Sequence, residues 1–306
     1  MENNEYNCPT IDELEEGKSI LLTFGEPGRI LKKNIRRTAI ACQILFIIVF
    51  NPISLFFGRN KPDFWMKKKS FAVSFAKKVF PFNLEGKKPD ESDHGQILVI
   101  NHPTLNDPIC TIIYALELYP DREVVVPVNL PWYEGIAKYK KFLSAIGVRI
   151  VPVLTPATAK RLGTNENISQ VQTMLVSNYT AEVAKIIKDG GMAVLAQQAT
   201  RQRYIFSSPE QSKTGDGILS TISFVLAGLK RSKILDKAMV CPIGIIPYSL
   251  KAKAKLNPFR KYTLNVGEPI LAADLSKVKN EAKRSADLFV LRALAELIPG
   301  EYRVER

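Results

Sequence analysis

The feature that most constrains the fold is a series of short apolar runs that alternate with segments of helical pattern. The run at 96–101 is apolar almost throughout, which is typical of a strand buried on both faces of a sheet. Strands are expected at 96–101, 123–127, 148–153, 192–196, 238–247 and 262–266. Helices are expected at 107–118, 132–146, 179–188, 218–229 and 272–297. This order predicts an α/β fold, with a mixed, largely parallel sheet flanked by helices.

The composition divides the chain into three expected parts. Residues 1–28 form an acidic segment that carries seven carboxylates against Lys18. Residues 29–80 are rich in apolar and basic side chains and predict a membrane-associated two-helix region. Residues 81–306 contain the alternating strands and helices and form one catalytic domain, because no linker or repeat divides them.

An uncharged segment at 38–57 favours contact with a membrane. Its length would just cross a bilayer core of about 30 Å as a helix. Asn51-Pro52 interrupts it, however, and basic residues flank it on both sides. A single span normally has its excess of Lys and Arg on one side. A hairpin that enters the membrane and returns is therefore the preferred interpretation, and a true span is the alternative.

Residues 63–80 predict a basic amphipathic helix next to that segment, because aromatic residues and valines alternate with lysines. Such a helix suits an anionic lipid surface. The alternative is a helical hairpin whose apolar faces are buried against the catalytic domain.

The strand at 96–101 leads into Asn101-His102, and Asp107 follows five positions later. An imidazole that a carboxylate orients is the minimal general base for activating a hydroxyl group. His102 is one of only two histidines in the chain. The simpler alternative is that Asp107 caps a helix that begins at Pro108.

Several arginines follow or precede the predicted strands. In open α/β sheets, reactive groups usually lie beyond the carboxyl ends of the strands. Thr200 and Arg201 follow the strand at 192–196, and a guanidinium beside a hydroxyl suits phosphate oxygens. Arg149 lies near the start of its strand, where it either binds phosphate or pairs with a carboxylate on the sheet edge.

The pattern Asn101-His102-x4-Asp107 after an apolar strand resembles the signature of the glycerol-phosphate and lysophospholipid acyltransferases. That family has four ordered sequence blocks, and the remaining three resemble segments that follow in the same order here. These segments are 142–149, which contains Gly147 and Arg149, then 196–201, which contains Thr200 and Arg201, and 240–243. The resemblance covers about residues 81–303.

The third block departs from the family pattern. The family has Phe, Pro, Glu and Gly at the positions of Ala196, Gln197, Gln198 and Ala199. A glutamine side chain carries no charge and cannot act as a base. Because the first block is intact, this departure puts the identity of the acceptor in question more than acyl transfer itself. A weakened enzyme is the other interpretation.

The resemblance implies an O-acyltransferase of phospholipid biosynthesis at the cytoplasmic face of a membrane. The acyl donor would be a thioester of coenzyme A or acyl carrier protein, and the acceptor a glycerol-phosphate or lysophospholipid hydroxyl. His102 would be the base and Asp107 would orient it. The expected acceptor-binding residues are Gly147, Arg149, Gln198, Thr200 and Arg201. Two alternatives are a non-catalytic lipid-binding or partner-docking module on the same fold, and an acyltransferase for another lipid acceptor.

The remaining composition narrows the partners. A net charge of +13 favours anionic partners such as lipid headgroups or the phosphates of coenzyme A. No nucleic-acid or nucleotide motif accompanies the basic residues. The four cysteines are scattered, without the paired spacing of a zinc site or a disulfide framework. We therefore expect no metal and no bound cofactor besides the acyl donor.

Overall fold

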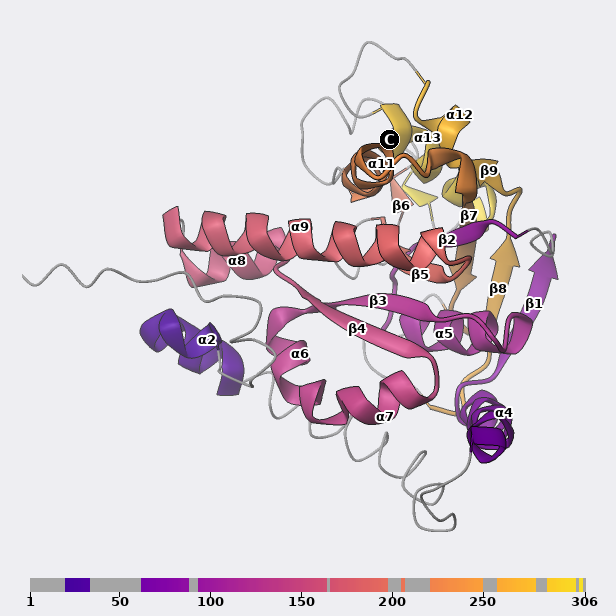
Figure 1. Ribbon diagram of the computed structural model, residues 1–306, viewed down its shortest axis with the longest axis horizontal. Helices are drawn as coiled ribbons and strands as arrows, with labels where there is room; N and C mark the ends of the chain where they lie inside the picture. The colour runs from indigo at the N-terminus through magenta and orange to yellow at the C-terminus, as the bar shows by residue number, and fades with distance from the viewer. Residues whose placement is uncertain are drawn as a thin grey trace, which may run out of the picture.

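The computed structural model describes residues 20–33, 62–87, 93–163, 166–197, 205–206, 221–249, 258–278, 285–300 and 303–304. Within these ranges the strands form one large mixed sheet and a two-stranded ribbon, with helices on both faces of the large sheet (Figure 1). The predicted mixed, largely parallel sheet flanked by helices is confirmed. The apolar segment at 38–57, and with it the predicted membrane hairpin, lies outside the described residues.

The large sheet has the strand order β1-β8-β7-β2-β5-β3-β4, and β9 pairs with β7. The strands from β7 to β4 are parallel to one another, whereas β8 and β9 run antiparallel to β7. The large sheet comprises β1 (Phe82–Gly86), β2 (Gly95–Ile100), β3 (Val124–Asn129), β4 (Val148–Val153), β5 (Met192–Ala196), β7 (Ala238–Ile246), β8 (Tyr262–Val266) and β9 (Ile270–Leu271). The ribbon pairs β6 (Ile205–Phe206) with β10 (Arg303–Val304).

The helices form two layers around the sheet (Figure 1). One layer contains α9 (Glu166–Lys188), α11 (Thr221–Arg231), α12 (Ala272–Leu275) and α13 (Ser285–Glu296), and the other contains α4 (Pro62–Val79), α5 (Asp107–Leu118) and α7 (Lys140–Ala145). Alternate residues of β2 point into the two layers: Ile97 and Val99 pack on the first, Leu98 and Ile100 on the second. Because every residue of β2 is buried, this strand lies at the centre of the fold.

A third, smaller apolar cluster joins the remaining helices at one end of the sheet. It brings Ile20 and Leu21 of α2 (Ile20–Thr23) against α6 (Leu130–Ile136), α8 (Pro156–Leu162) and the first turns of α9. A backbone-to-side-chain hydrogen bond from Leu21 N to Glu134 Oε1 (2.9 Å) fixes this contact.

Strand positions were predicted more accurately than helix boundaries. The predicted start of the helix at 179–188 is wrong, because α9 begins at Glu166. Its first half is polar on the outside, and only Ile168, Val171 and Leu175 form the inner stripe. The helix predicted at 132–146 is divided into α6, the 3-10 turn η1 (Ala137–Tyr139) and α7. The short 3-10 helix η2 (Leu235–Lys237) and edge strand β1 had no expected counterpart.

Helix α4 packs on the α/β domain with one face. Val73, Ala76 and Val79 are buried in the apolar cluster that α4 shares with α5 and the sheet. Lys69 Nζ donates to the carbonyl of Pro120. Phe71 remains about half exposed at 52%. For this helix the arrangement favours burial of the apolar face against the domain, which was the alternative to lying on lipid.

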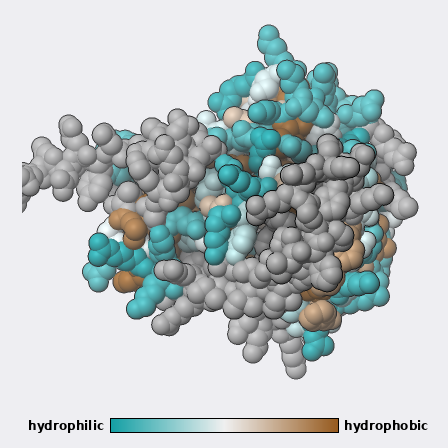
Figure 2. All heavy atoms as spheres, turned by 60° about the horizontal axis from the view of Figure 1, so that its bottom comes forward, coloured by the Kyte–Doolittle hydropathy of each residue, from teal (hydrophilic) through white to brown (hydrophobic). Residues whose placement is uncertain are grey.

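Among the helices that the structure describes, none combines the length and apolar character needed to cross a membrane. On the face shown in Figure 2, apolar residues of the described surface form separate spots among hydrophilic ones.

Gly95 at the start of β2 provides a test of the packing between sheet and helix. A Cβ atom at this position would lie 2.6 Å from the carbonyl oxygen of Ile187 and 2.8 Å from its Cα, and backbone atoms cannot rotate away. We expect Gly95→Ala to lower the free energy of unfolding by about 1–3 kcal/mol, the usual cost of overpacking. Gly300→Ala is the matched control, because nothing lies within 4 Å of its Cβ position. Equal urea midpoints for the two variants would contradict this packing.

Candidate active site

His102 and Asp107 lie in and beside the loop that joins β2 to α5. His102 Nδ1 and Asp107 Oδ2 are 3.2 Å apart. The aspartate side chain is fully buried, whereas 17% of the histidine side chain is exposed. The pairing predicted from the sequence is therefore present in the structure. When Nδ1–H donates to the carboxylate, the lone pair of the imidazole is on Nε2, as a general base requires.

The loop itself holds Asp107 in place through Thr104. Asp107 Oδ2 accepts a hydrogen bond from Thr104 N (2.6 Å), and Oδ1 accepts one from Thr104 Oγ1 (2.7 Å). Asp107 is the first residue of α5, and its N-cap is Asn106, which makes no side-chain capping bond. The alternative that Asp107 caps a helix beginning at Pro108 is therefore wrong. Its carboxylate binds the preceding loop and the histidine instead.

Asn101 fixes the position from which His102 projects. Its buried side chain forms two hydrogen bonds with the backbone of Ile245: Oδ1 accepts from Ile245 N (2.6 Å) and Nδ2 donates to Ile245 O (2.9 Å). Strand β7 continues beyond the end of β2, so this amide replaces the pairing that β2 no longer provides. The asparagine before the histidine thus anchors the loop that carries His102 to the neighbouring strand.

Burial raises the pKa of the Asp107 carboxyl group, and the hydrogen bonds from His102 and Thr104 offset part of this rise. Burial also raises the pKa of the Cys241 thiol to about 12 and raises that of the Cys110 thiol. Both thiols are therefore neutral near pH 7 and unsuited to act as nucleophiles. Within the described ranges, no group of three or more His, Cys, Asp or Glu residues suits a metal ion.

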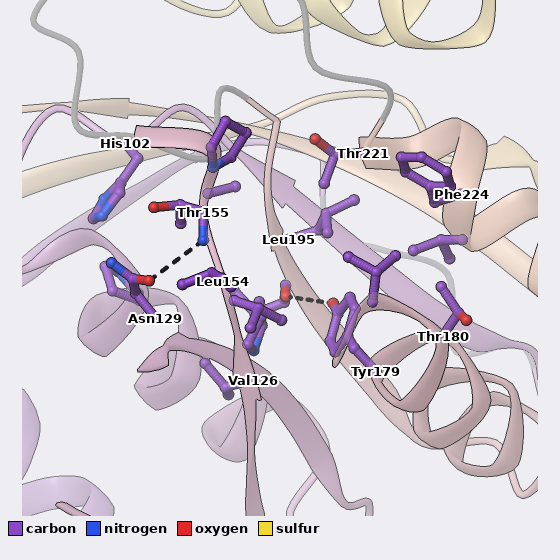
Figure 3. Close-up of a pocket in the computed structure, with 18 of the residues that line it drawn as sticks. His102, Val126, Asn129, Leu154, Thr155, Tyr179, Thr180, Leu195, Thr221 and Phe224 are labelled. Carbon is purple, nitrogen blue, oxygen red and sulfur yellow. Dashed lines mark hydrogen bonds between the residues drawn. The ribbon is translucent and has the colours of Figure 1, made fainter. Parts of the chain in front are cut away.

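An apolar cavity of about 250 Å³ lies beside His102 at the carboxyl ends of the parallel strands. It extends from His102 to Thr180 and Phe224, between the strands and helices α9 and α11 (Figure 3). Side chains of β3, β4, β5, α9 and α11 line it, among them Val126, Val153, Leu154, Val176, Tyr179, Val194, Leu195 and Val225.

The cavity exists because β3 and β5 separate. They pair only at Val124–Met192 and Val125–Ala193, although β3 continues to Asn129 and β5 to Ala196. Pro127 lies in the separated part of β3, where it has no N–H to donate across the gap. Tyr179 OH of α9 donates to the carbonyl of Val194 (3.2 Å), which satisfies a backbone group in the separated part of β5 (Figure 3).

A few polar groups lie at the His102 end of the cavity. Asn129 Nδ2 donates to Thr158 Oγ1 (2.8 Å), and Asn129 Oδ1 accepts from Thr155 N at 3.4 Å (Figure 3). Both Asn129 and Thr155 line the cavity. Neither residue was among those expected from the sequence. Asn129 ends β3 and Thr155 lies two residues after β4, so both could have been found at the sheet edge that carries His102.

Arg149 and Gly147 are not brought to this edge. Arg149 is the second residue of β4, so it lies at the amino end of the parallel strands. Its guanidinium pairs with Glu182 (2.7 Å) and with Glu123 (3.1 Å). This arrangement favours the alternative in which Arg149 pairs with carboxylates on the sheet edge. Gly147 adopts a φ of +82° in the turn before β4, which is a structural role.

The third block is only partly described. Gln198, Thr200 and Arg201 lie outside the described residues. Ala196, the first residue of the block, lines the cavity, and Gln197 follows it with a buried side chain. Gln197 Nε2 donates to Asp287 Oδ1 (2.9 Å).

Asp287 is a buried carboxylate that the sequence analysis did not single out. It connects three elements, because it also accepts hydrogen bonds from Ile222 N (2.9 Å) and Ser223 Oγ at the start of α11. Since Thr221 and Phe224 of the same helix line the cavity, Asp287 on α13 holds the cavity wall against the end of β5.

The comparisons with known proteins give a likeness to solved structures but none in sequence. Neither a protein-family model nor a curated protein sequence matches the chain. Among solved structures, the chain is similar to the 1-acyl-sn-glycerophosphate (LPA) acyltransferase PlsC from Thermotoga maritima. The identity is 13%, the TM-score is 0.44, and the match covers 88% of this chain and 95% of the other. At this identity and TM-score the likeness does not identify the reaction.

The Asp287 network predicts a pH-dependent stability. Burial raises the pKa of Asp287, although its hydrogen-bond donors offset part of the rise. At a pH between the unfolded pKa of about 3.9 and the raised folded pKa, the folded state binds more protons than the unfolded state. The contribution to stability therefore falls as the pH rises through this window. Relative to Asp287→Asn, which cannot titrate, the wild type should be most stable at the acidic end.

Urea unfolding at a series of pH values measures the difference in free energy of unfolding between wild type and Asp287→Asn. Between the two pKa values of Asp287, this difference is expected to change by up to about 1.4 kcal/mol per pH unit. Asp274→Asn changes an exposed carboxylate on α12 and is the control. A difference between wild type and Asp287→Asn that does not change with pH would contradict the raised pKa of the buried carboxyl group.

Proposed function

We propose that the chain is an O-acyltransferase that moves an acyl group from a thioester to a lipid hydroxyl. The observation that carries the proposal is the His102–Asp107 pair, 3.2 Å apart, at one end of an apolar cavity. A general base supplies the chemistry for activating a hydroxyl, and an apolar cavity suits an acyl chain. The donor is a thioester of coenzyme A or acyl carrier protein.

The proposed reaction uses His102 twice. Nε2 removes the proton from the acceptor hydroxyl while the oxygen attacks the thioester carbonyl. The tetrahedral intermediate then collapses, the carbon–sulfur bond breaks, and the imidazolium returns the proton to the leaving thiolate. Asp107 fixes the imidazole tautomer and stabilises the positive charge between the two steps. The residues require neither a metal nor a bound cofactor for this sequence.

The acyl chain of the donor is assigned to the cavity. Its lining is mostly apolar, with Asn129 and Thr155 near His102 and Thr180 and Thr221 toward Phe224 (Figure 3). The apolar lining supports a hydrocarbon tail in the cavity, and the position of His102 at one end supports a thioester carbonyl there.

The acceptor is proposed to be a glycerol-phosphate or lysophospholipid. Thr200 and Arg201 remain the proposed phosphate contacts on the grounds of the sequence blocks, and Gln198 is proposed beside them. Arg149 and Gly147 are not retained, because the structure describes them at the opposite end of the strands. The proposed location is the cytoplasmic face of a membrane, with anionic lipid as partner.

A non-catalytic lipid-binding module is the competing function, and the same apolar cavity supports it. The two differ in turnover. Incubation with radiolabelled acyl-coenzyme A and a panel of lysophospholipid and glycerol-phosphate acceptors, followed by thin-layer chromatography, separates them: acylated product supports the enzyme, and a bound but unconverted donor supports the module.

The base provides the direct test of mechanism. We expect His102→Ala to lower kcat/KM by at least roughly 10³-fold, the scale of losing a positioned base, with folding retained. Asp107→Asn should be impaired to a similar or smaller extent. His94→Ala removes the other histidine of the chain and should keep full activity. A well-folded His102→Ala protein with near wild-type turnover contradicts the mechanism.

Val176 tests the assignment of the acyl chain. It lies on α9 one turn after Gln172, whose amide donates to Leu154 O, and one turn before Thr180 at the far end. Val176→Phe should therefore lower kcat/KM for long-chain donors by at least roughly tenfold and leave short-chain donors unaffected, because filling a packed space costs about 1–3 kcal/mol. The control is Ser177→Phe, which places the same ring on the exposed side of α9. A uniform loss over all chain lengths argues against this assignment.

A further inference from the structure

Phe259 is an exposed aromatic residue in an unfavourable backbone conformation. Its side chain is 70% exposed, and its φ of +59° lies in the left-handed region that bulky residues rarely adopt. Phe259 N donates to the carbonyl of Val79 at the end of α4 (2.6 Å), and Tyr262 N donates to Pro81 O (3.0 Å). Two backbone hydrogen bonds therefore hold the turn against the domain, with the phenylalanine ring toward solvent.

Two basic residues follow Phe259 in the chain, and one of them lies over an aromatic ring. Arg260 and Lys261 follow it and are both exposed. The guanidinium of Arg260 lies 5.4 Å from the centre of the Tyr248 ring, and Tyr248 is 42% exposed. Tyr248 packs edge-on against buried Tyr262, with the ring centres 6.0 Å apart. We call Tyr248, Phe259, Arg260 and Lys261 the aromatic–basic patch.

The charges next to the patch are also mainly positive. Lys78 at the end of α4 is exposed, and it precedes the residue whose carbonyl holds Phe259. Lys77 is paired with Glu117 (2.6 Å), so its charge is largely compensated. Arg260, Lys261 and Lys78 thus give the patch a positive field beside an apolar ring.

The patch lies at the same sheet edge as the candidate active site. Strand β8 is antiparallel to β7, and Thr263 near its start pairs with Ile246 at the end of β7. Ile245 near the end of β7 forms hydrogen bonds with Asn101, and Asn101 is the residue before His102. Tyr248 lies two residues after the end of β7. The aromatic–basic patch and the loop that carries His102 are therefore neighbours on the edge formed by the carboxyl ends of the strands.

We infer that the aromatic–basic patch docks on the interfacial region of an anionic bilayer and turns the His102 opening toward the lipid. A protruding aromatic ring enters the headgroup and acyl boundary, while Arg and Lys beside it bind anionic headgroups. This inference rests on the proposed function, because a lipid acceptor must reach His102 from a membrane.

Lipid fits these observations better than a protein partner. The apolar contribution of the patch is one protruding ring and part of a tyrosine, which is too small for a stable protein interface. Positive charge complements an anionic lipid surface and opposes pairing of the patch with a second copy of itself. The strained backbone at Phe259 gives no packing inside the domain in return, since its side chain is exposed.

A fluorescence experiment locates the patch relative to lipid. Phe259→Trp is compared with Phe289→Trp, which places the same probe at a 43% exposed position on α13, in the opposite helix layer (Figure 1). Full-length proteins are mixed with phosphatidylcholine vesicles, with and without phosphatidylglycerol, that contain brominated acyl chains. We expect added quenching for Phe259→Trp on phosphatidylglycerol vesicles and none for Phe289→Trp, after subtraction of the signal from native Trp65 and Trp132.

Vesicle co-sedimentation measures the strength of the contact. Phe259→Asn removes the ring with a residue that tolerates positive φ, and it should weaken partitioning at least roughly tenfold. Arg260→Glu with Lys261→Glu should weaken binding to phosphatidylglycerol vesicles by a similar factor. The controls are Phe289→Asn and the charge reversal of Lys230 and Arg231, two exposed residues at the end of α11. The expected loss of vesicle binding is the same when another segment of the chain also binds lipid, because the free energies of independent contacts add.

The outcomes separate this inference from the proposed function. His102→Ala should bind vesicles like the wild type, so docking is measured without turnover. The inference is overturned if the wild type does not bind phosphatidylglycerol vesicles, if Phe259→Trp shows no added quenching, or if Phe259→Asn binds normally. It is also overturned if Phe259→Asn changes only the oligomeric state in light scattering, which would make the patch a contact between copies.

Discussion

The separation of β3 from β5 is the constraint on which the candidate site depends. Parallel strands normally remain paired along their length, and a pair that parts inside a domain leaves polar backbone groups to satisfy. Here Pro127 removes one donor from β3, and the Tyr179 hydroxyl satisfies the carbonyl of Val194 in β5. The gap can therefore stay open and apolar without an energetic penalty from these groups. A continuous β3–β5 ladder would leave His102 beside a closed sheet.

The second requirement is that the carboxylate of Asp107 keeps its position while it is buried from solvent. Burial of Asp107 disfavours its charged form, and the structure offsets this with Thr104, which donates from both its backbone and its side chain. The remaining interaction is with His102, so the carboxylate gains most when the imidazole becomes positively charged. That is the moment at which a general base has accepted a proton. The Asn101–Ile245 bonds keep this arrangement aligned with the cavity because they tie the loop to β7.

The sequence predicted the parts of this site that local pattern determines. Apolar runs identified the central strands, and the His102–Asp107 spacing identified the pair, because both depend on residues close together in the chain. Arg149 could not be placed in this way. Its pairing with Glu123 and Glu182 depends on β4 lying beside β3 and beneath α9. The cavity and Asp287 are likewise products of long-range contacts, since Asp287 meets Gln197 across 90 positions of the chain.

A long-range contact also involves the altered third block. In this chain Gln197 is not a free loop residue: its amide binds buried Asp287, which also holds the first turn of α11. A proline at position 197 has no side-chain donor and would leave the Asp287 carboxylate with one partner fewer, which is costly for a buried charge. The Gln197–Asp287 bond therefore gives a physical reason for a glutamine at position 197. It couples the end of β5 to the first turn of α11, whose Thr221 and Phe224 line the cavity.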